Sequence, residues 1–308
     1  MKRVRLSGKA HWAAALFVLT VAACTTPPTV VEDDLLPPQL PQRWATYTTA
    51  GPTEFTAEPG SMTSETGCEI AYTHFLPGGR ATGDDPLLVL AHGFLRSREN
   101  MRGWAELFAS HGVRTVTASF CNSSLFNGDH AQNALDLRAL ADELAGPATP
   151  ILYAGYSAGG LSAMLAAAQD ERTFGYLGID PVDSDGMLAA VGSLRAPAFY
   201  LLGEPNPCNR DGATRSLLPD GSPAWLIEIP YATHCTFEDP TDSLCVNLCG
   251  TVAPEESNEQ LRQTVQALGT AFVVAQFGTD PGAMSLMSIR ELRRLEAAGS
   301  LQIITPMP

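Results

Sequence analysis

One pattern in this sequence is typical of an activated serine. The apolar segment ILYAGYS (151–157) runs into the string GYSAG (155–159), and a helical segment follows at 161–170. A serine flanked by small residues at a strand-to-helix turn can adopt the strained backbone of a nucleophile, whereas the alternative is a structural turn with an inert serine. The context predicts that Ser157 attacks a carbonyl carbon.

A serine hydroxyl needs a base within hydrogen-bond reach near neutral pH. The base follows the nucleophile in sequences with this kind of turn. Of the six histidines, only His234 lies after Ser157, in a loop that follows the apolar segment 224–230. We therefore expect His234 to be the base. His92 precedes the turn and is expected to brace a loop.

The third member of such a site is a carboxylate that orients the histidine. Asp180 ends the apolar segment 174–180. The commonest position for the acid is after the next strand, where Glu204, Asn206 and Asp211 lie. Asp180 itself and Asp183, three residues on, are the other candidates.

Two backbone N–H groups should bind the developing oxyanion. One is expected from Ala158, directly after the nucleophile, and the other from Phe94, in the loop after the first core strand. No metal site is predicted. The aspartates near 180 lack the glycine and the distal glutamate of a calcium loop, so we interpret them as a polar turn; they are Asp180, Asp183 and Asp185.

Strand-like and helical segments alternate from residue 87 onward. The predicted strands are 69–77, 87–92, 113–120, 151–157, 174–180, 197–203 and, as the last, 224–230, and residues 44–58 are β-like. The predicted helices are 100–112, 130–146, 161–170, 254–277 and 285–299. This alternation indicates an α/β fold with a mostly parallel central sheet and helices on both faces. The candidate residues fall at the carboxyl ends of strands, where such sheets carry their chemistry.

Residues from about 87 to 240 resemble α/β-hydrolases of the plasma platelet-activating-factor acetylhydrolase and chlorophyllase groups. The matching stretches are LAHGFLRSREN, WAELFASHGVRTVTASF, GYSAGGLSAMLAA, FGYLGIDPVD and ATH. The resemblance implies the α/β-hydrolase fold and a triad of Ser157, Asp180 and His234. Asn206 stands where polyester-hydrolase-like cutinases carry their aspartate, and an asparagine cannot compensate an imidazolium charge. The resemblance therefore implies that the acid lies one strand earlier, and we favour Asp180 over Asp183, Glu204 and Asp211. About 16 residues separate Asp180 from the next strand, so no large lid is expected.

Six cysteines besides Cys24 depart from that resemblance: Cys68, Cys121, Cys208, Cys235, Cys245 and Cys249. An even number in an exported chain favours disulfides over buried thiols. The expected topology places Cys68 near Cys121 and predicts that they are bridged. The other four can pair in three ways, and any of these should clamp the loops that carry His234 and residues 204–211.

The N-terminus is typical of a bacterial lipoprotein signal. Residues 1–23 hold a cationic start and a short apolar run, and Cys24 is the predicted lipidation site. Residues 24–43 are interpreted as a proline-rich tether and residues 44–308 as one catalytic domain. The expected location is the cell envelope, in the periplasm or at the outer membrane.

Charge narrows the choice of partners. Removing residues 1–23 takes four positive charges and no negative ones from a net charge of −14, which leaves −18. A protein with this negative charge should not bind nucleic acid or anionic lipid, so membrane contact is expected through the lipid anchor alone.

These observations together predict a monomeric, lidless serine carboxylesterase that acts on small-molecule or polymeric esters. It should work through an acyl-enzyme and without a cofactor. The alternatives are an acyltransferase or thioesterase with the same triad, and a catalytically silent lipoprotein that binds an envelope component.

Overall fold

The computed structural model describes residues 37–79, 84–124, 127–183, 187–216, 224–250 and 255–305. The predicted signal peptide, Cys24, Asp185 and the tether as far as residue 36 lie outside these ranges. Within the described residues, secondary structure starts with helix α1 (Gln42–Ala45). The last residues assigned to the tether therefore belong to a helix, in which Trp44 is buried.

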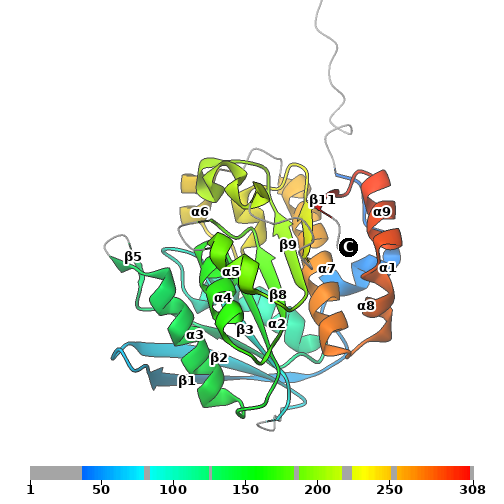
Figure 1. The fold of residues 1–308 in the computed structure, drawn as a ribbon. Coiled ribbons are helices and arrows are strands. Elements are labelled where there is room, and N and C mark those ends of the chain that lie inside the picture. Colours follow the sequence, from blue (N-terminus) through cyan, green and yellow to red (C-terminus); the bar gives the residue numbers. More distant parts are fainter. Residues whose placement is uncertain are drawn as a thin grey trace, which may run out of the picture. The chain divides into compact units, whose positions relative to one another are not determined.

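Nine strands of the described chain form one mixed sheet, in the order β1-β2-β4-β3-β7-β8-β9-β10-β11 (Figure 1). Neighbours from β4 to β10 are parallel, whereas β1, β2 and β11 pair antiparallel. The strands are β1 (Phe55–Thr63), β2 (Glu69–Pro77), β3 (Leu87–Ala91), β4 (Thr115–Ala118), β7 (Ile151–Tyr156), β8 (Thr173–Ile179), β9 (Ala198–Leu202), β10 (Ala224–Glu228) and β11 (Gln302–Thr305); β5 (Ser123–Ser124) and β6 (Asn127–Gly128) form a separate pair. The predicted α/β class with a mostly parallel sheet is confirmed.

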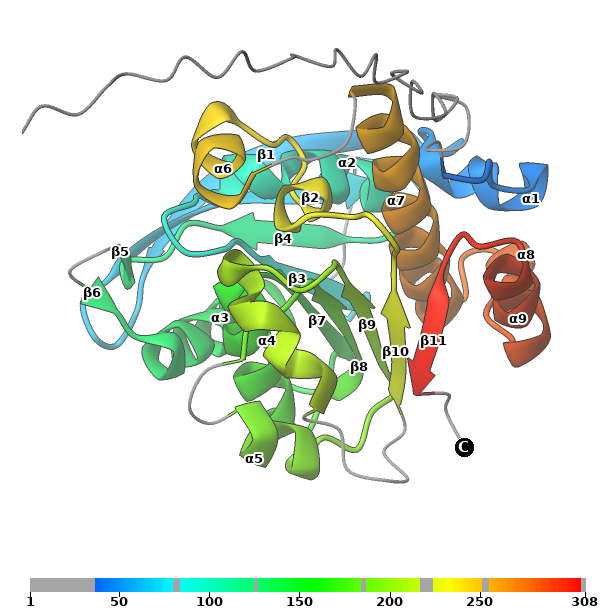
Figure 2. The same ribbon diagram turned by 90° about the horizontal axis from the view of Figure 1, so that it is seen from above.

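Helices cover both faces of this sheet (Figure 2). They are α2 (Arg102–Ser110), α3 (His130–Leu144), α4 (Ala158–Gln169), α5 (Met187–Ser193), α6 (Ser243–Cys249), α7 (Glu255–Phe277), α8 (Pro281–Leu286) and α9 (Ile289–Ala297), with short 3₁₀ segments η2 (Thr46–Thr48), η3 (Arg98–Met101), η4 (Pro207–Ser216) and η5 (His234–Phe237). None of these helices has the length and apolar character needed to cross a bilayer.

The alternation of side chains along each strand divides the core into two clusters. In β3, Leu88 and Leu90 pack with Trp104 of α2 on one face. Leu87 and Val89 pack with Leu137 of α3 on the other face. A strand that is apolar at every position can only be buried on both sides, which is why the run at 87–91 forms an interior strand.

Three further sequence predictions are wrong in detail. Strand β10 is not the last strand, because β11 follows it in the chain and pairs with it at the sheet edge. With four residues, β11 is too short to stand out in the sequence. Residues 44–48 are helical rather than extended, since Trp44 and Tyr47 lie one turn apart and both enter the core. The helix predicted at 285–299 is divided, because α8 ends at Leu286 and α9 begins at Ile289.

Candidate active site

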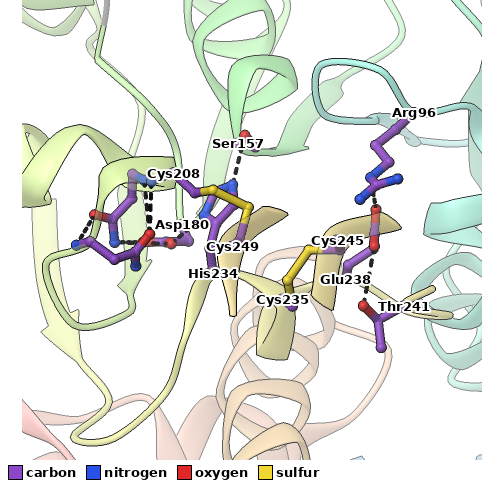
Figure 3. The surroundings of a disulfide bond; sticks show 12 residues. Arg96, Ser157, Asp180, Cys208, His234, Cys235, Glu238, Thr241, Cys245 and Cys249 are labelled. Atoms are coloured by element: carbon purple, nitrogen blue, oxygen red, sulfur yellow. Dashed lines mark hydrogen bonds and ion pairs between the residues drawn. A yellow bond between two sulfur atoms is a disulfide. The ribbon is translucent and has the colours of Figure 1, made fainter. Parts of the chain in front are cut away.

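Ser157, His234 and Asp180 meet at the carboxyl edge of the parallel strands (Figure 3). The Nε2 atom of His234 lies 2.9 Å from Ser157 Oγ, and its Nδ1 atom lies 2.6 Å from Asp180 Oδ2. All three residues are at least nine-tenths buried. With Asp180 ionised, the ring carries its proton on Nδ1 and leaves Nε2 as an acceptor for the serine proton.

The backbone at Ser157 has the strained conformation that the sequence pattern predicts. Ser157 joins β7 to α4 with φ of 55° and ψ of −128°. A Cβ atom on Gly155 would collide with the carbonyl of Gly159, and one on Gly159 would collide with the carbonyl oxygen of His92. Only glycine at both positions allows this turn, which presents the serine side chain at the end of the strand.

Asp180 is the candidate acid that the structure places against His234. It follows β8 with φ of 41°, and its Oδ1 atom accepts a hydrogen bond from the Gly203 N–H at 2.9 Å. The Glu204 carboxylate instead accepts from the Tyr231 N–H at 2.8 Å. Neither it nor any other described carboxylate besides that of Asp180 hydrogen-bonds His234, so Asp183 and Asp211 do not take this position.

The sequence analysis missed Asn209, which supports this acid. Asn209 is buried, and its Nδ2 atom donates to both oxygens of Asp180, at 3.3 and 3.5 Å. Its own Oδ1 atom accepts from the N–H groups of Asn206 and Gly212. Asn206, the residue considered in the sequence, organises the η4 loop, and the side chain that reaches Asp180 comes three residues later. Nothing in the local sequence distinguishes the two asparagines.

Asn209→Ala is expected to lower kcat for the ester hydrolysis that the sequence predicts about tenfold. A hydrogen bond to a charged group contributes roughly 1.5–3 kcal/mol, and the distances of 3.3 and 3.5 Å here are long, which favours the low end of these energies. Steady-state kinetics on a nitrophenyl ester measure the effect. Asn206→Ala is the matched control, since it removes loop hydrogen bonds that do not reach Asp180. Equal losses in both variants would show that the loop matters and the contact does not.

The loop opposite the triad is held by His92. Its Nδ1 atom donates to the Gly93 carbonyl at 2.7 Å and its Nε2 atom accepts from the Phe120 N–H at 3.1 Å. Complete burial lowers the pKa of His92 to about 4, so the ring stays neutral with this single tautomer. His92 therefore has the bracing position expected of it. Of the expected oxyanion donors, Phe94 lines a cavity together with Ser157, and Ala158 follows Ser157 directly as the first residue of α4.

An ion pair joins this loop to the loop that carries His234. Arg96 Nε lies 2.7 Å from the carboxylate of the fully buried Glu238 (Figure 3). Arg96 also pairs with Asp242. Tyr156 adds a second constraint, because its hydroxyl donates to the His234 carbonyl and its ring lies 4.8 Å from the imidazole. His234 is thus positioned from the sheet and from the opposite loop.

The free energy of unfolding should depend on pH through the protonation of Glu238. Burial raises the pKa of Glu238 from 4.5 to about 7, and Arg96 only partly opposes the rise. The folded chain then holds this proton more tightly than the unfolded chain, so the contribution of Glu238 is complete below about pH 4.5 and is lost as the pH rises through 7. We expect the unfolding free energy of the wild type, relative to Glu238→Gln, to fall by about 3 kcal/mol between pH 4.5 and pH 8.

Urea unfolding of both proteins at several pH values measures that difference. His74 and His92, whose pKa values burial lowers to about 4, titrate in both proteins and cancel in the comparison. A difference that stays constant over this range contradicts the prediction.

All six described cysteines are paired. The predicted Cys68–Cys121 bridge is confirmed. The remaining four form Cys208–Cys249 and Cys235–Cys245. The sulfurs of Cys235, Cys245 and Cys249 lie within 4.8 Å of one another, a grouping that free thiolates could use for a metal, but each is bonded in a disulfide.

The Cys208–Cys249 bridge is expected to serve activity beyond its contribution to stability, because Cys208 adjoins Asn209. Cys208→Ser/Cys249→Ser should lower kcat by about as much as Asn209→Ala. The matched control is Cys68→Ser/Cys121→Ser. The two bridges span 41 and 53 residues, so the chain-entropy account gives each a similar contribution of about 4 kcal/mol. Chemical denaturation and kinetics of both variants provide the comparison. Equal losses of kcat in the two variants, alongside their similar losses of stability, would contradict the expectation.

A small, mainly apolar cavity of about 160 Å³ opens beside the triad. It is lined by Phe94, Leu95, Arg96, Tyr156, Ser157, Cys208, His234, Leu244, Cys245, Leu248 and Cys249. A larger cavity of about 520 Å³ lies at the opposite edge of the sheet, between the end of α4 and residues 193–196, away from the triad. No protein-family model matches this sequence, and no curated protein gives a significant match.

Proposed function

We propose that this protein is a serine carboxylic-ester hydrolase with the α/β-hydrolase fold. The observation that carries the proposal is the continuous contact from Ser157 Oγ through His234 to Asp180, at 2.9 and 2.6 Å. The strained turn between β7 and α4 and the chain order of serine, aspartate and histidine support the same fold assignment.

The reaction follows from these positions. Ser157 Oγ attacks the ester carbonyl carbon while its proton passes to His234 Nε2, and the Phe94 and Ala158 N–H groups receive the oxyanion. Asp180 stabilises the imidazolium. His234 then protonates the departing alkoxide, which leaves as the alcohol, and the acyl group remains on Ser157. Water, deprotonated by His234, attacks this ester, releases the carboxylic acid and restores the serine.

Labelling with a fluorophosphonate tests the proposal, since the reagent bonds to activated serines. The full chain would carry Cys24→Ser, so that no lipid is added, and would be purified with its disulfides formed. We expect the wild-type site to be labelled and Ser157→Ala to remain unlabelled. Ser162→Ala is the matched control, because Ser162 lies on α4, which Ser157 directly precedes, and its hydroxyl donates to the Ala158 carbonyl. A folded wild-type site that takes no label would overturn the proposal.

A further inference from the structure

Helix α6 is a short element held against the active site by two disulfides. Its seven residues form fewer than two turns, and a helix of this length is not stable alone. Cys245 and Cys249, four residues apart, share one face and bond to Cys235 and Cys208 (Figure 3). Cys235 follows the base His234 directly. The helix is therefore fixed to the two loops that hold His234 and Asp180.

The face of α6 beside these cysteines carries two leucines that line the cavity and are partly exposed to solvent. Leu244 and Leu248 are also four residues apart, and they are 44% and 62% exposed. Seven large hydrophobic side chains are exposed among the residues that the structure describes, and three of them, Leu244, Leu248 and Phe94, line the cavity that contains Ser157. Scattered exposed leucines need no explanation, but apolar side chains gathered around a reactive group indicate a binding surface.

These leucines do not contribute to the core. Cys245 is the buried residue of α6 and supplies its packing, so polar side chains at 244 and 248 would leave the fold unchanged. Arg96, the cation at the cavity, is already paired with Glu238 and Asp242. The net charge of −14 further disfavours an anionic ligand. The occupant that fits is a neutral apolar chain.

We infer that α6 is the substrate-selecting element, and that Leu244 and Leu248 bind the aliphatic chain of a medium-chain ester. This inference rests on the proposed ester hydrolysis. An aliphatic cavity of about 150 Å³ accommodates benzene, so the 160 Å³ here takes a group of about six carbons. The end of a longer chain continues over the two leucines. The chain can belong to the acyl or to the alcohol part of the ester, and the test separates the two.

The test compares short and medium chains in wild type, in Leu244→Gln/Leu248→Gln and in Leu135→Gln, all in the full chain with Cys24→Ser. Leu135, on α3 and 48% exposed, is the matched control, since it lies outside this cavity. The acyl arm measures kcat/KM for p-nitrophenyl octanoate and acetate, and the alcohol arm measures it for octyl and ethyl acetate. In at least one arm, the kcat/KM of the double variant should fall about tenfold more for the medium-chain ester than for the short-chain ester. Leu135→Gln should keep the wild-type ratio.

The outcomes separate the role of α6 from the proposed ester hydrolysis on which it rests. A wild type that hydrolyses these esters, with a double variant that retains the wild-type chain-length ratio in both arms, overturns the role of α6 and leaves the esterase proposal standing. A folded, disulfide-bonded wild type that hydrolyses none of the esters overturns both. Intact disulfides and an unchanged unfolding midpoint in the double variant verify that α6 is still in place.

Discussion

Replacing Ser157 with alanine is expected to lower kcat by a factor on the order of 10⁶, and His234→Ala should cost about the same. The two residues act as one unit, because the serine is nucleophilic only while Nε2, 2.9 Å away, can accept its proton. The double variant should therefore be no slower than either single variant. Single-turnover and steady-state hydrolysis of a nitrophenyl ester would measure all three.

The residual rate is informative as well. Some rate above that of water should remain, because oxyanion binding and substrate positioning do not need the serine. Losses that multiply in the double variant would contradict the shared role of the pair. A Ser157→Ala enzyme that keeps most of its activity would place the nucleophile elsewhere in the chain.

Asp180→Asn is the second substitution with a very large expected effect, a loss of kcat on the order of 10⁴. The asparagine is nearly the same size, so the fold should persist, but it cannot compensate the imidazolium charge. Its amide can also turn an N–H toward Nδ1 and favour the tautomer that leaves no acceptor for the serine. The loss should appear in kcat rather than in KM, since Asp180 lies behind the imidazole and away from the cavity.

The other candidate acids provide the controls for this prediction. Asp183→Asn, Glu204→Gln and Asp211→Asn should each cost far less than Asp180→Asn, because none of these carboxylates contacts His234 in the described structure. Glu204→Gln alters a bond to the Tyr231 N–H, so it reports on the conformation of the loop before the base. If one of the three lost as much activity as Asp180→Asn, the assignment of the acid would be wrong.

The sequence alone determined most of the sheet and the order of the reacting residues. Strands buried on both faces need continuous apolar runs, so β3, β7, β8, β9 and β10 stand out within a residue or two of their ends. The glycines around Ser157 predict its strained turn, because only glycine avoids the collisions there. His234 follows from chain order, and the Cys68–Cys121 bridge follows from the expected pairing of strands.

Only the tertiary structure decided which loop groups meet. The choice among four carboxylates depends on how η4 returns toward β8, and local sequence does not encode that path. The same holds for Asn209, for the pairing of the last four cysteines and for the Arg96–Glu238 ion pair, since each joins residues from different loops. Helix α6 is the clearest case. Seven residues do not favour a helix in isolation, so its existence depends on the disulfides that only the folded chain can align.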